Sequence, residues 1–144
     1  MDRGQAKRFL LRYRKCVEQI QKLQVEIEET ATRATHRTAN PDEYNKSNCY
    51  GDKVGNGAAT LATLSERIAA AKAARLRAEM EIFFVIDKVQ DGDVAEVLAR
   101  HYLELETLAN IAGIMALTER WVLVLHKRGL DEVARILDER SANG

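Results

Sequence analysis

The chain has 144 residues, enough for one domain or for a small domain with an extension. Its 22 basic and 22 acidic side chains give a formal net charge of zero, unlike the clear basic excess of many DNA-binding domains. Its longest strongly apolar run is IFFVI (82–86), and its charged start is not followed by an apolar segment, so we expect neither a membrane span nor an export signal.

Residues 4–37 are predicted to form one long amphipathic helix. Apolar or small side chains recur at alternating steps of four and three residues from Phe9 to Ala34, which is the heptad seam of a coiled coil. The same step returns from Leu61 to Val89. Two helices of about 34 residues, each roughly 50 Å long and joined by one loop, predict a long antiparallel helical hairpin.

The predicted loop is TANPDEYNKSNCYGDKVGNG, residues 38–57, which contains the only proline, Pro41. Its Asn, Asp, Ser and Gly content is typical of a loop, and its length favours a mobile or functional segment. We therefore expect a helical hairpin over 1–90, acting as the oligomerisation element, and a second domain over 91–144. The extra apolar surface of residues 80–86 requires a further partner, either the C-terminal domain or another copy of the chain.

Three shorter helices are predicted after residue 90. Asp93, in the DGD that ends the second long helix, is expected to cap a helix over 94–103. Helices over 107–114 and 118–138 follow, and Gly129 is a candidate site for a bend or break in the last one. No segment shows the alternation of a β-strand, so the expected fold class is all-α.

The stretch TLANIAGIMALTERWVLVLHKRGL, residues 107–130, has the pattern of a helix-turn-helix. The turn is expected at 115–117, and the small side chain of Ala112 allows two helices to cross closely. Thr118 is a good N-cap for the helix that follows. Three apolar side chains of that helix face inward at helical spacing: Val122, Leu125 and Leu130.

The segment HYLELETLANIAGIMALTERWVLVLHKRGLDEV (101–133) resembles region 4 of sigma-70-type factors. Still more closely, the chain resembles small phage transcriptional regulators of the ArpU and RinA type over nearly its whole length. These have a long helix, a loop (here YGDKVGNG), a second helix and a region-4-like end with an Arg-Trp-Val…Leu-His pattern. The pattern residues here are Arg120, Trp121, Val122, Leu125 and His126. The resemblance implies sequence-specific binding of double-stranded DNA in phage or prophage transcription. It also implies RNA polymerase as a candidate partner.

The resemblance assigns DNA contacts to seven residues: Thr118, Glu119, Arg120, Leu123, Val124, Lys127 and Arg128. The helix N-terminus at Thr118 would meet a backbone phosphate. Arg120 would bind guanine through two hydrogen bonds, and Glu119 would accept one from a cytosine amino group. Leu123 would pack on thymine methyl groups, while Lys127 and Arg128 would contact phosphates further along.

The sequence departs from the family pattern in two ways. Ala116 occupies a turn position where glycine is usual, and a positive φ costs alanine about 1 kcal/mol. Leu123 and Val124 are apolar on the outward face, where DNA-reading helices usually carry polar groups. An alternative function is therefore a protein-interaction adaptor that no longer binds DNA. Another is a small-terminase-like packaging component, which would form a ring of subunits.

The charge distribution bears on these alternatives. Residues 1–38 hold nine basic and five acidic side chains (net +4), and residues 91–144 hold six basic and ten acidic ones (net −4). Because phosphate neutralisation supplies most nonspecific affinity, the C-terminal part alone is expected to bind DNA weakly. The basic start is either a solvated helix face or an arm that contacts phosphates, and it consists of Arg3, Lys7, Arg8, Arg12, Arg14 and Lys15.

Signatures of catalysis are not found in the sequence: it has neither a phosphate-binding loop nor a nucleophile elbow. The three histidines lack the spacing of metal ligands, so we expect no enzyme activity, metal or cofactor. Cys16 and Cys49 are expected to be free thiols in a reducing cytoplasm. The expected assembly is a homo-oligomer, with a dimer favoured.

Overall fold

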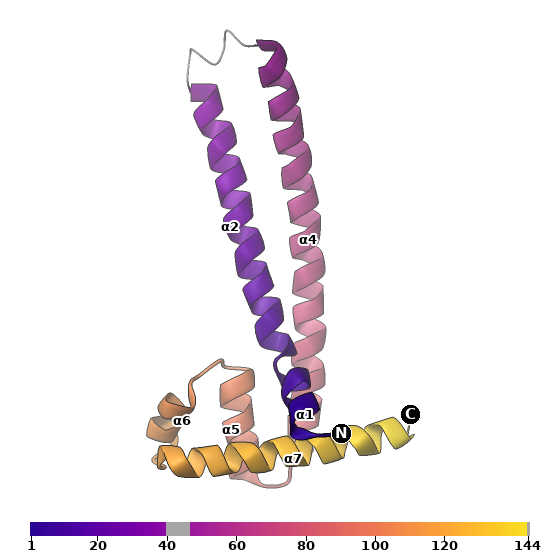
Figure 1. The fold of residues 1–144 in the computed structure, drawn as a ribbon, viewed down its shortest axis with the longest axis vertical. Coiled ribbons are helices and arrows are strands. Elements are labelled where there is room, and N and C mark those ends of the chain that lie inside the picture. The colour runs from indigo at the N-terminus through magenta and orange to yellow at the C-terminus, as the bar shows by residue number, and fades with distance from the viewer. Residues whose placement is uncertain (40–46, 144) are drawn as a thin grey trace. The chain divides into compact units, whose positions relative to one another are not determined.

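All the regular secondary structure in the described part of the chain is helical. The computed structural model describes residues 1–39 and 47–143, and the side chains of 1–33 and 58–143. The helices are α1 (Arg3–Leu10), α2 (Arg12–Ala39), α4 (Ser47–Asp87), α5 (Gly92–Tyr102), α6 (Leu108–Met115) and α7 (Glu119–Asn143), as Figure 1 shows. The predicted all-α class is confirmed.

The helices form two compact units. One consists of Met1–Lys15 with Arg75–Gly144, and the other of Cys16–Ala74. This division differs from the one drawn from the sequence at residue 90. The difference arises because α1 and the last turns of α4 share a core with the C-terminal helices.

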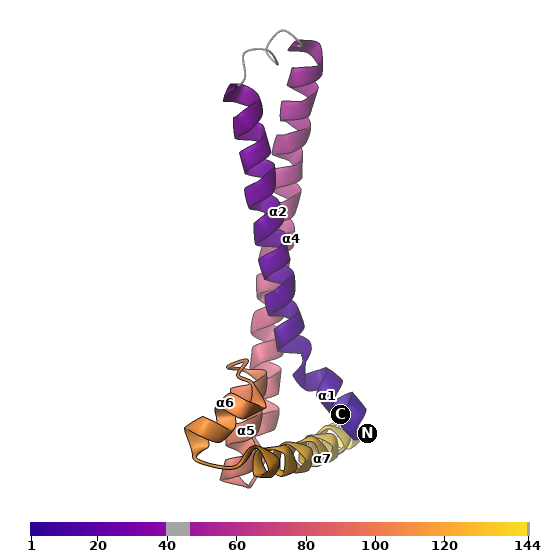
Figure 2. The same cartoon turned by 60° about the vertical axis from the view of Figure 1, so that its left-hand side comes forward.

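In the first unit, α7 contacts α1, α5 and α6 (Figure 2). Each helix contributes an apolar face to one cluster, in which Leu10, Ile82 and Leu98 are fully buried. Burial of apolar surface on this scale is the main stabilising term in a domain of this size. The same cluster holds Ile111 of α6 and Val122 of α7, so it fixes the helices on which the candidate site lies.

The single helix predicted over residues 4–37 is wrong, because it is interrupted at Leu11: α1 ends at Leu10 and α2 begins at Arg12. Neither proline nor glycine is present there, so the interruption has a tertiary cause. Ala6 and Leu10, one turn apart, are both fully buried in the cluster with α7. Arg3 adds two hydrogen bonds to Asp131 of α7, at 2.6 and 2.8 Å.

The N-cap predicted for α5 is two residues too late in the chain. Asp91, not Asp93, is the N-cap of α5. Its Oδ1 accepts hydrogen bonds from the backbone N–H of Asp93 at 3.0 Å and of Val94 at 3.3 Å. Because Asp91 takes up the first free N–H groups, Gly92 and Asp93 are already helical.

Gly129 does not bend or break the last helix, since α7 runs through it to Asn143. A Cβ atom at this position would lie 2.8–2.9 Å from three side-chain carbons of Leu98 in α5. The glycine is therefore required by the close approach of α5 to α7. From the sequence, the small residue at a close helix crossing was expected to be Ala112, which is also buried.

In the second unit, α2 and α4 share a narrow apolar seam. Ile20, Leu23, Leu64 and Ala71 are buried together, and Ile27 and Ile68 pack against them. All six belong to the two predicted heptad patterns. The seam therefore follows the sequence period, as expected for packed amphipathic helices.

The predicted loop over 38–57 is shorter in the structure. Helix α2 continues to Ala39, and α4 already begins at Ser47, while residues 40–46 lie outside the described residues. Glycine in a helix interior costs about 1 kcal/mol relative to alanine but does not forbid the helix. The glycines of this segment therefore indicated a loop less strongly than the prediction assumed.

No single helix in the described part of the chain is long and apolar enough to cross a bilayer. The bent pair of α6 and α7 meets that requirement, by length and composition, only when the two are taken together.

Candidate nucleic-acid interface

The turn between α6 and α7 consists of residues 116–118, and the two helix directions differ by 109°. Ala116 has φ 56° and ψ 42°, the left-handed conformation for which glycine is favoured. The N–H of Leu117 donates to the carbonyl of Ala112 at 2.9 Å, which closes the end of α6. The turn therefore keeps the conformation that glycine usually provides, although an alanine occupies the position.

Thr118 starts α7 as predicted. Its hydroxyl accepts a hydrogen bond from the backbone N–H of Trp121 at 3.1 Å, and its carbonyl accepts one from Val122 at 3.0 Å. The hydroxyl thus satisfies one of the unpaired N–H groups at the start of the helix. The remaining N–H groups and the helix dipole make this end of α7 attractive to an anion.

Helix α7 separates a buried face from an outward one. Val122 and Leu125 are 0% and 2% exposed. On the opposite side, Arg120, Val124 and Lys127 follow one another at steps of four and three residues, so they form a single stripe. Arg120 and Lys127 are exposed and Val124 is partly buried. This stripe is the part of the predicted set that the structure brings together.

Leu123 and Arg128 lie on opposite edges of that stripe. Leu123 is 46% exposed, and Glu119 on the same edge is exposed in the first turn. The Arg128 guanidinium lies 5.1 Å from the ring centroid of Trp121, a cation–π contact on the other edge. Arg128 is therefore held apart from Arg120 and Lys127 by its contact with Trp121.

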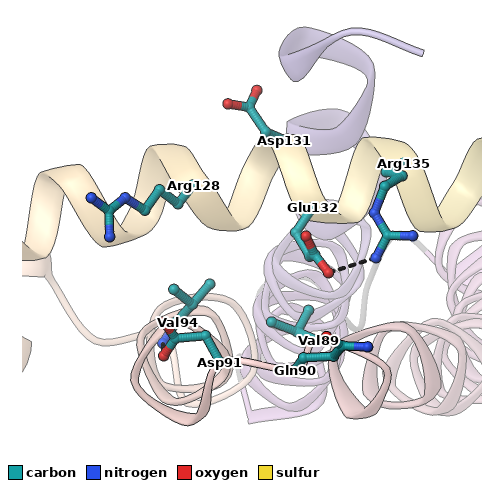
Figure 3. A pocket seen from close by; sticks show the side chains of 8 residues that line it. All are labelled: Val89, Gln90, Asp91, Val94, Arg128, Asp131, Glu132 and Arg135. Carbon is teal, nitrogen blue, oxygen red and sulfur yellow. Dashed lines mark hydrogen bonds and ion pairs between the residues drawn. The ribbon is translucent and has the colours of Figure 1, made fainter.

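Arg128 also lines a surface cleft of about 530 Å³ that sequence reasoning did not anticipate. Figure 3 shows it directed away from Glu132 and Arg135, which are joined by an ion pair of 2.6 Å. The other lining residues are Val89, Gln90, Asp91, Val94 and Asp131. With three carboxylates and two guanidinium groups, the cleft is a poor site for phosphate. No local pattern predicts it, because its walls come from separate segments.

The basic start of the chain is only partly available to a ligand. Arg3 forms a pair of hydrogen bonds with Asp131, and this contact lowers the pKa of the Asp131 carboxyl. The amino group of Met1 lies 2.6 Å from Asp138. Arg12 pairs with Glu81 at 2.8 Å. Two carboxylates of α7 are thus neutralised by the first residues of the chain, which reduces the negative charge of this helix.

A polar cluster lies beneath the outward stripe. The hydroxyl of Tyr102 and Nε2 of His126 are 2.6 Å apart, and both side chains are buried. His101 donates from Nδ1 to the carbonyl of Glu106 at 2.7 Å. Burial, followed by the charges of His101 and Lys7, lowers the pKa of His126 to about 4. Burial raises the pKa of Tyr102 to about 12.

His126 and Tyr102 are therefore both neutral at pH 7, and their pairing supports α7 from within.

In the described residues, no three His, Cys, Asp or Glu side chains gather as metal ligands. Comparisons with protein families, with curated proteins and with solved structures find no match for this chain. A functional proposal accordingly depends on the geometry of α6 and α7.

Proposed function

We propose that this protein binds specific double-stranded DNA and regulates phage or prophage transcription. In this proposal α6 and α7 form a helix-turn-helix of the sigma region-4 type. The observation that carries it is the three-residue turn with a 109° change of helix direction. DNA-binding helix-turn-helix units have a turn of three to four residues and helices at about 90–120°. The second helix of such a unit lies in the major groove.

The stripe on α7 supports this function. Arg120 is exposed in the first turn, and in this proposal it forms two hydrogen bonds to a guanine edge. Lys127, two turns further on, suits a phosphate contact, and Val124 between them suits a thymine methyl group. Arg128 would have to leave Trp121 to reach a phosphate, which costs about 0.5–1 kcal/mol for an exposed cation–π contact. We therefore assign it a smaller share than Lys127.

The long paired helices are the proposed oligomerisation element, and a dimer would present two copies of α7 to two half-sites. A dimer strengthens DNA binding that would be weak for one copy, because residues 91–144 carry a net charge of −4. Two copies double the phosphate contacts, and Arg3 and the Met1 amino group offset carboxylates of α7 in each. RNA polymerase remains the proposed protein partner, as implied by the likeness to region 4.

The test is selection of preferred sites from random duplex DNA, followed by fluorescence anisotropy at two salt concentrations. We expect Arg120→Ala to weaken binding to the preferred site by about 1–3 kcal/mol and to relax its sequence preference. Arg140→Ala is the matched control. It removes the same charge from the same helix about 30 Å away and should leave the preference unchanged.

No binding at low salt by the folded wild-type protein would refute the proposal. Equal binding by the Arg120 and Arg140 variants would refute the role of the stripe.

A second candidate function, a protein-interaction adaptor, is favoured by apolar exposure on the same helices. Ile114, Trp121 and Leu123 are 51%, 40% and 46% exposed. Exposed aromatic side chains such as Trp121 are enriched in protein–protein interfaces. Leu123→Arg separates the two functions. It should preserve or strengthen a DNA contact, whereas it should abolish a contact with an apolar protein surface.

A further inference from the structure

The last turns of α4 carry an exposed apolar stripe within the first unit. Leu76, Met80, Phe83 and Phe84 are 56%, 50%, 56% and 56% exposed. Their spacing of four, three and one residues puts them on one face of the helix. Together with Leu103, which follows the last residue of α5, they line a shallow groove of about 360 Å³, with Glu79 at its rim. We call Leu76, Met80, Phe83, Phe84 and Leu103 the α4 apolar patch.

The patch lies on a helix whose other side is already buried. Ala78, Ile82 and Val85 are at most 1% exposed in the core of the unit. A helix that is apolar on both sides is normally covered on both sides. The rings of Phe83 and Phe84 meet edge to face with centroids 6.2 Å apart, so they form one continuous aromatic surface at the centre of the patch.

We propose that a second copy of this chain covers the α4 apolar patch. The two α4 helices would lie antiparallel about a two-fold axis near Met80. Such an axis puts Leu76 of one copy opposite Phe84 of the other, and Met80 opposite Met80. Leu76, Met80 and Phe84 then meet apolar side chains of the other copy, as a self-complementary two-fold interface requires.

The charges on the Arg77 and Glu81 edge of the patch fit the same arrangement, whereas the axis brings the two Glu79 carboxylates of the other edge toward each other. Arg77 and Glu81 each follow a patch residue by one position, so they lie along the same edge of α4. In an antiparallel pair this edge faces itself, and the axis near Met80 brings Arg77 of one copy toward Glu81 of the other. The Glu81 side chain is 40% exposed and accessible to a second cation while it pairs with Arg12. The edge is thus electrostatically complementary to its own copy.

The size of the patch predicts a moderate affinity. Half-exposed large side chains present on the order of 100 Å² each, so the patch offers roughly 400–500 Å² per copy. A pair would bury about 800–1,000 Å² from the patches and somewhat more with their edges. Because stable specific interfaces bury about 1,200–2,000 Å², we expect a concentration-dependent dimer with a Kd on the order of micromolar.

The C-terminal helices do not serve as the covering partner in the described residues. They contribute only Leu103 to the patch and leave Phe83 and Phe84 more than half exposed. Of the two partners that the sequence suggested for residues 80–86, the C-terminal helices cover one side, where Ile82, Val85 and Ile86 are buried. The second copy is proposed for the side that stays exposed. A nucleic acid fits it poorly, since the groove is lined by apolar side chains and by the carboxylate-bearing Glu79.

The test is sedimentation velocity of the full chain over a range of concentrations, without DNA. We expect the wild type to dimerise and Phe83→Glu to raise the dimer Kd by about thirtyfold or more, since it places a charge in the aromatic centre. Ala109→Glu is the control. It adds the same charge at an exposed helical position outside the patch, and it should leave the Kd unchanged.

A wild-type protein that is still monomeric at roughly 100 µM would overturn the proposal, because a second copy would then not cover the patch with the expected affinity. An unchanged dimer in Phe83→Glu would overturn the choice of surface. Either result is independent of DNA binding, which is measured separately.

Cross-linking keeps the proposal testable if Phe83→Glu fails to fold. In a Cys16→Ser, Cys49→Ser background, Met80→Cys should form a disulfide between copies under copper phenanthroline and air. Leu76→Cys should cross-link poorly to itself but well to Phe84→Cys in a mixture of the two proteins. Strong self-cross-linking of Leu76→Cys, or none at Met80→Cys, would overturn the antiparallel arrangement.

Discussion

The two compact units of this chain differ in how their helices exclude water. Nineteen buried side chains form one cluster in the unit of Met1–Lys15 and Arg75–Gly144. In the described part of the unit Cys16–Ala74, the corresponding cluster contains four. Two paired helices bury one stripe each, whereas several helices that cross at large angles enclose a volume. The comparison predicts a rigid first unit and a second unit that opens locally at lower free energy.

The largest expected effect is on the free energy of unfolding. It is seen when a Leu→Ala substitution is made in each of the two clusters and the two losses are compared. Leu98→Ala, at a fully buried position of the first unit, should lower the free energy of unfolding by about 3–5 kcal/mol because it leaves an enclosed cavity. Leu64→Ala, in the seam of the second unit, should cost about 1–2 kcal/mol because water and neighbouring side chains can fill the space. Urea denaturation followed by circular dichroism measures both. Equal losses would show that the seam is as tightly enclosed as the larger cluster.

The second prediction concerns pH and the buried polar pair of the first unit. The folded pKa of His126 is about 4, below its ordinary value of 6.5, so its neutral form stabilises the fold fully above pH 6.5. As pH falls from 6.5 toward 4, the unfolded chain takes up the proton first, and stability should fall by roughly 2–3 kcal/mol. His126→Gln should remove this part of the pH dependence while the carboxylates still titrate. Identical urea midpoints against pH in both proteins would contradict the burial of a neutral histidine.

The third prediction tests the close approach of α5 and α7. Gly129→Ala forces a methyl group against Leu98 and should destabilise the protein by about 1–2 kcal/mol, after allowing for the better helix propensity of alanine. Gly113→Ala is the matched control. Its Cβ would meet nothing within 4 Å, so thermal unfolding should show a gain of up to about 1 kcal/mol.

The shared contact can be tested with a double substitution. When Leu98→Ala is present, Gly129→Ala should no longer destabilise, because the obstructing side chain is gone. An additive loss in the double variant would mean that the glycine is required for another reason.

The smallest expected effect concerns the turn of the proposed helix-turn-helix. Ala116→Gly relieves the positive φ but adds freedom to the unfolded chain, so it should stabilise by at most about 1 kcal/mol. Ala109→Gly, at an exposed position within α6, should instead destabilise by about 1 kcal/mol. Differential scanning calorimetry distinguishes the two signs. A loss at both positions would mean that Ala116 is not strained in solution.

Patterns within a few residues predicted several features of the candidate site. Thr118 was expected to cap α7 and does so, because an N-cap bond spans only three residues. Ala116 was identified as a turn position that glycine usually occupies, and it has the left-handed conformation that glycine favours. The seam of Ile20, Leu23 and Leu64 follows the heptad period. The DNA-contacting roles of the stripe on α7 remain predictions.

Structural features that depend on contacts between segments far apart in the sequence were not predicted, or were predicted at the wrong residue. Arg3 was grouped with a basic arm, but it pairs with Asp131, 128 positions away. The break at Leu11 and the role of Gly129 both depend on packing against other helices. The Tyr102–His126 pair was not foreseen, since its partners are 24 residues apart.

The sequence by itself determined the helical class, the spacing of the apolar faces and the chemistry of the turn before α7, because backbone preferences and helical period act over a few residues. Only the tertiary structure decided which charges are paired, which glycine is crowded and which apolar face is left exposed on α4. The physical reason is that these properties depend on distances between segments, which several helices set together when they close one core.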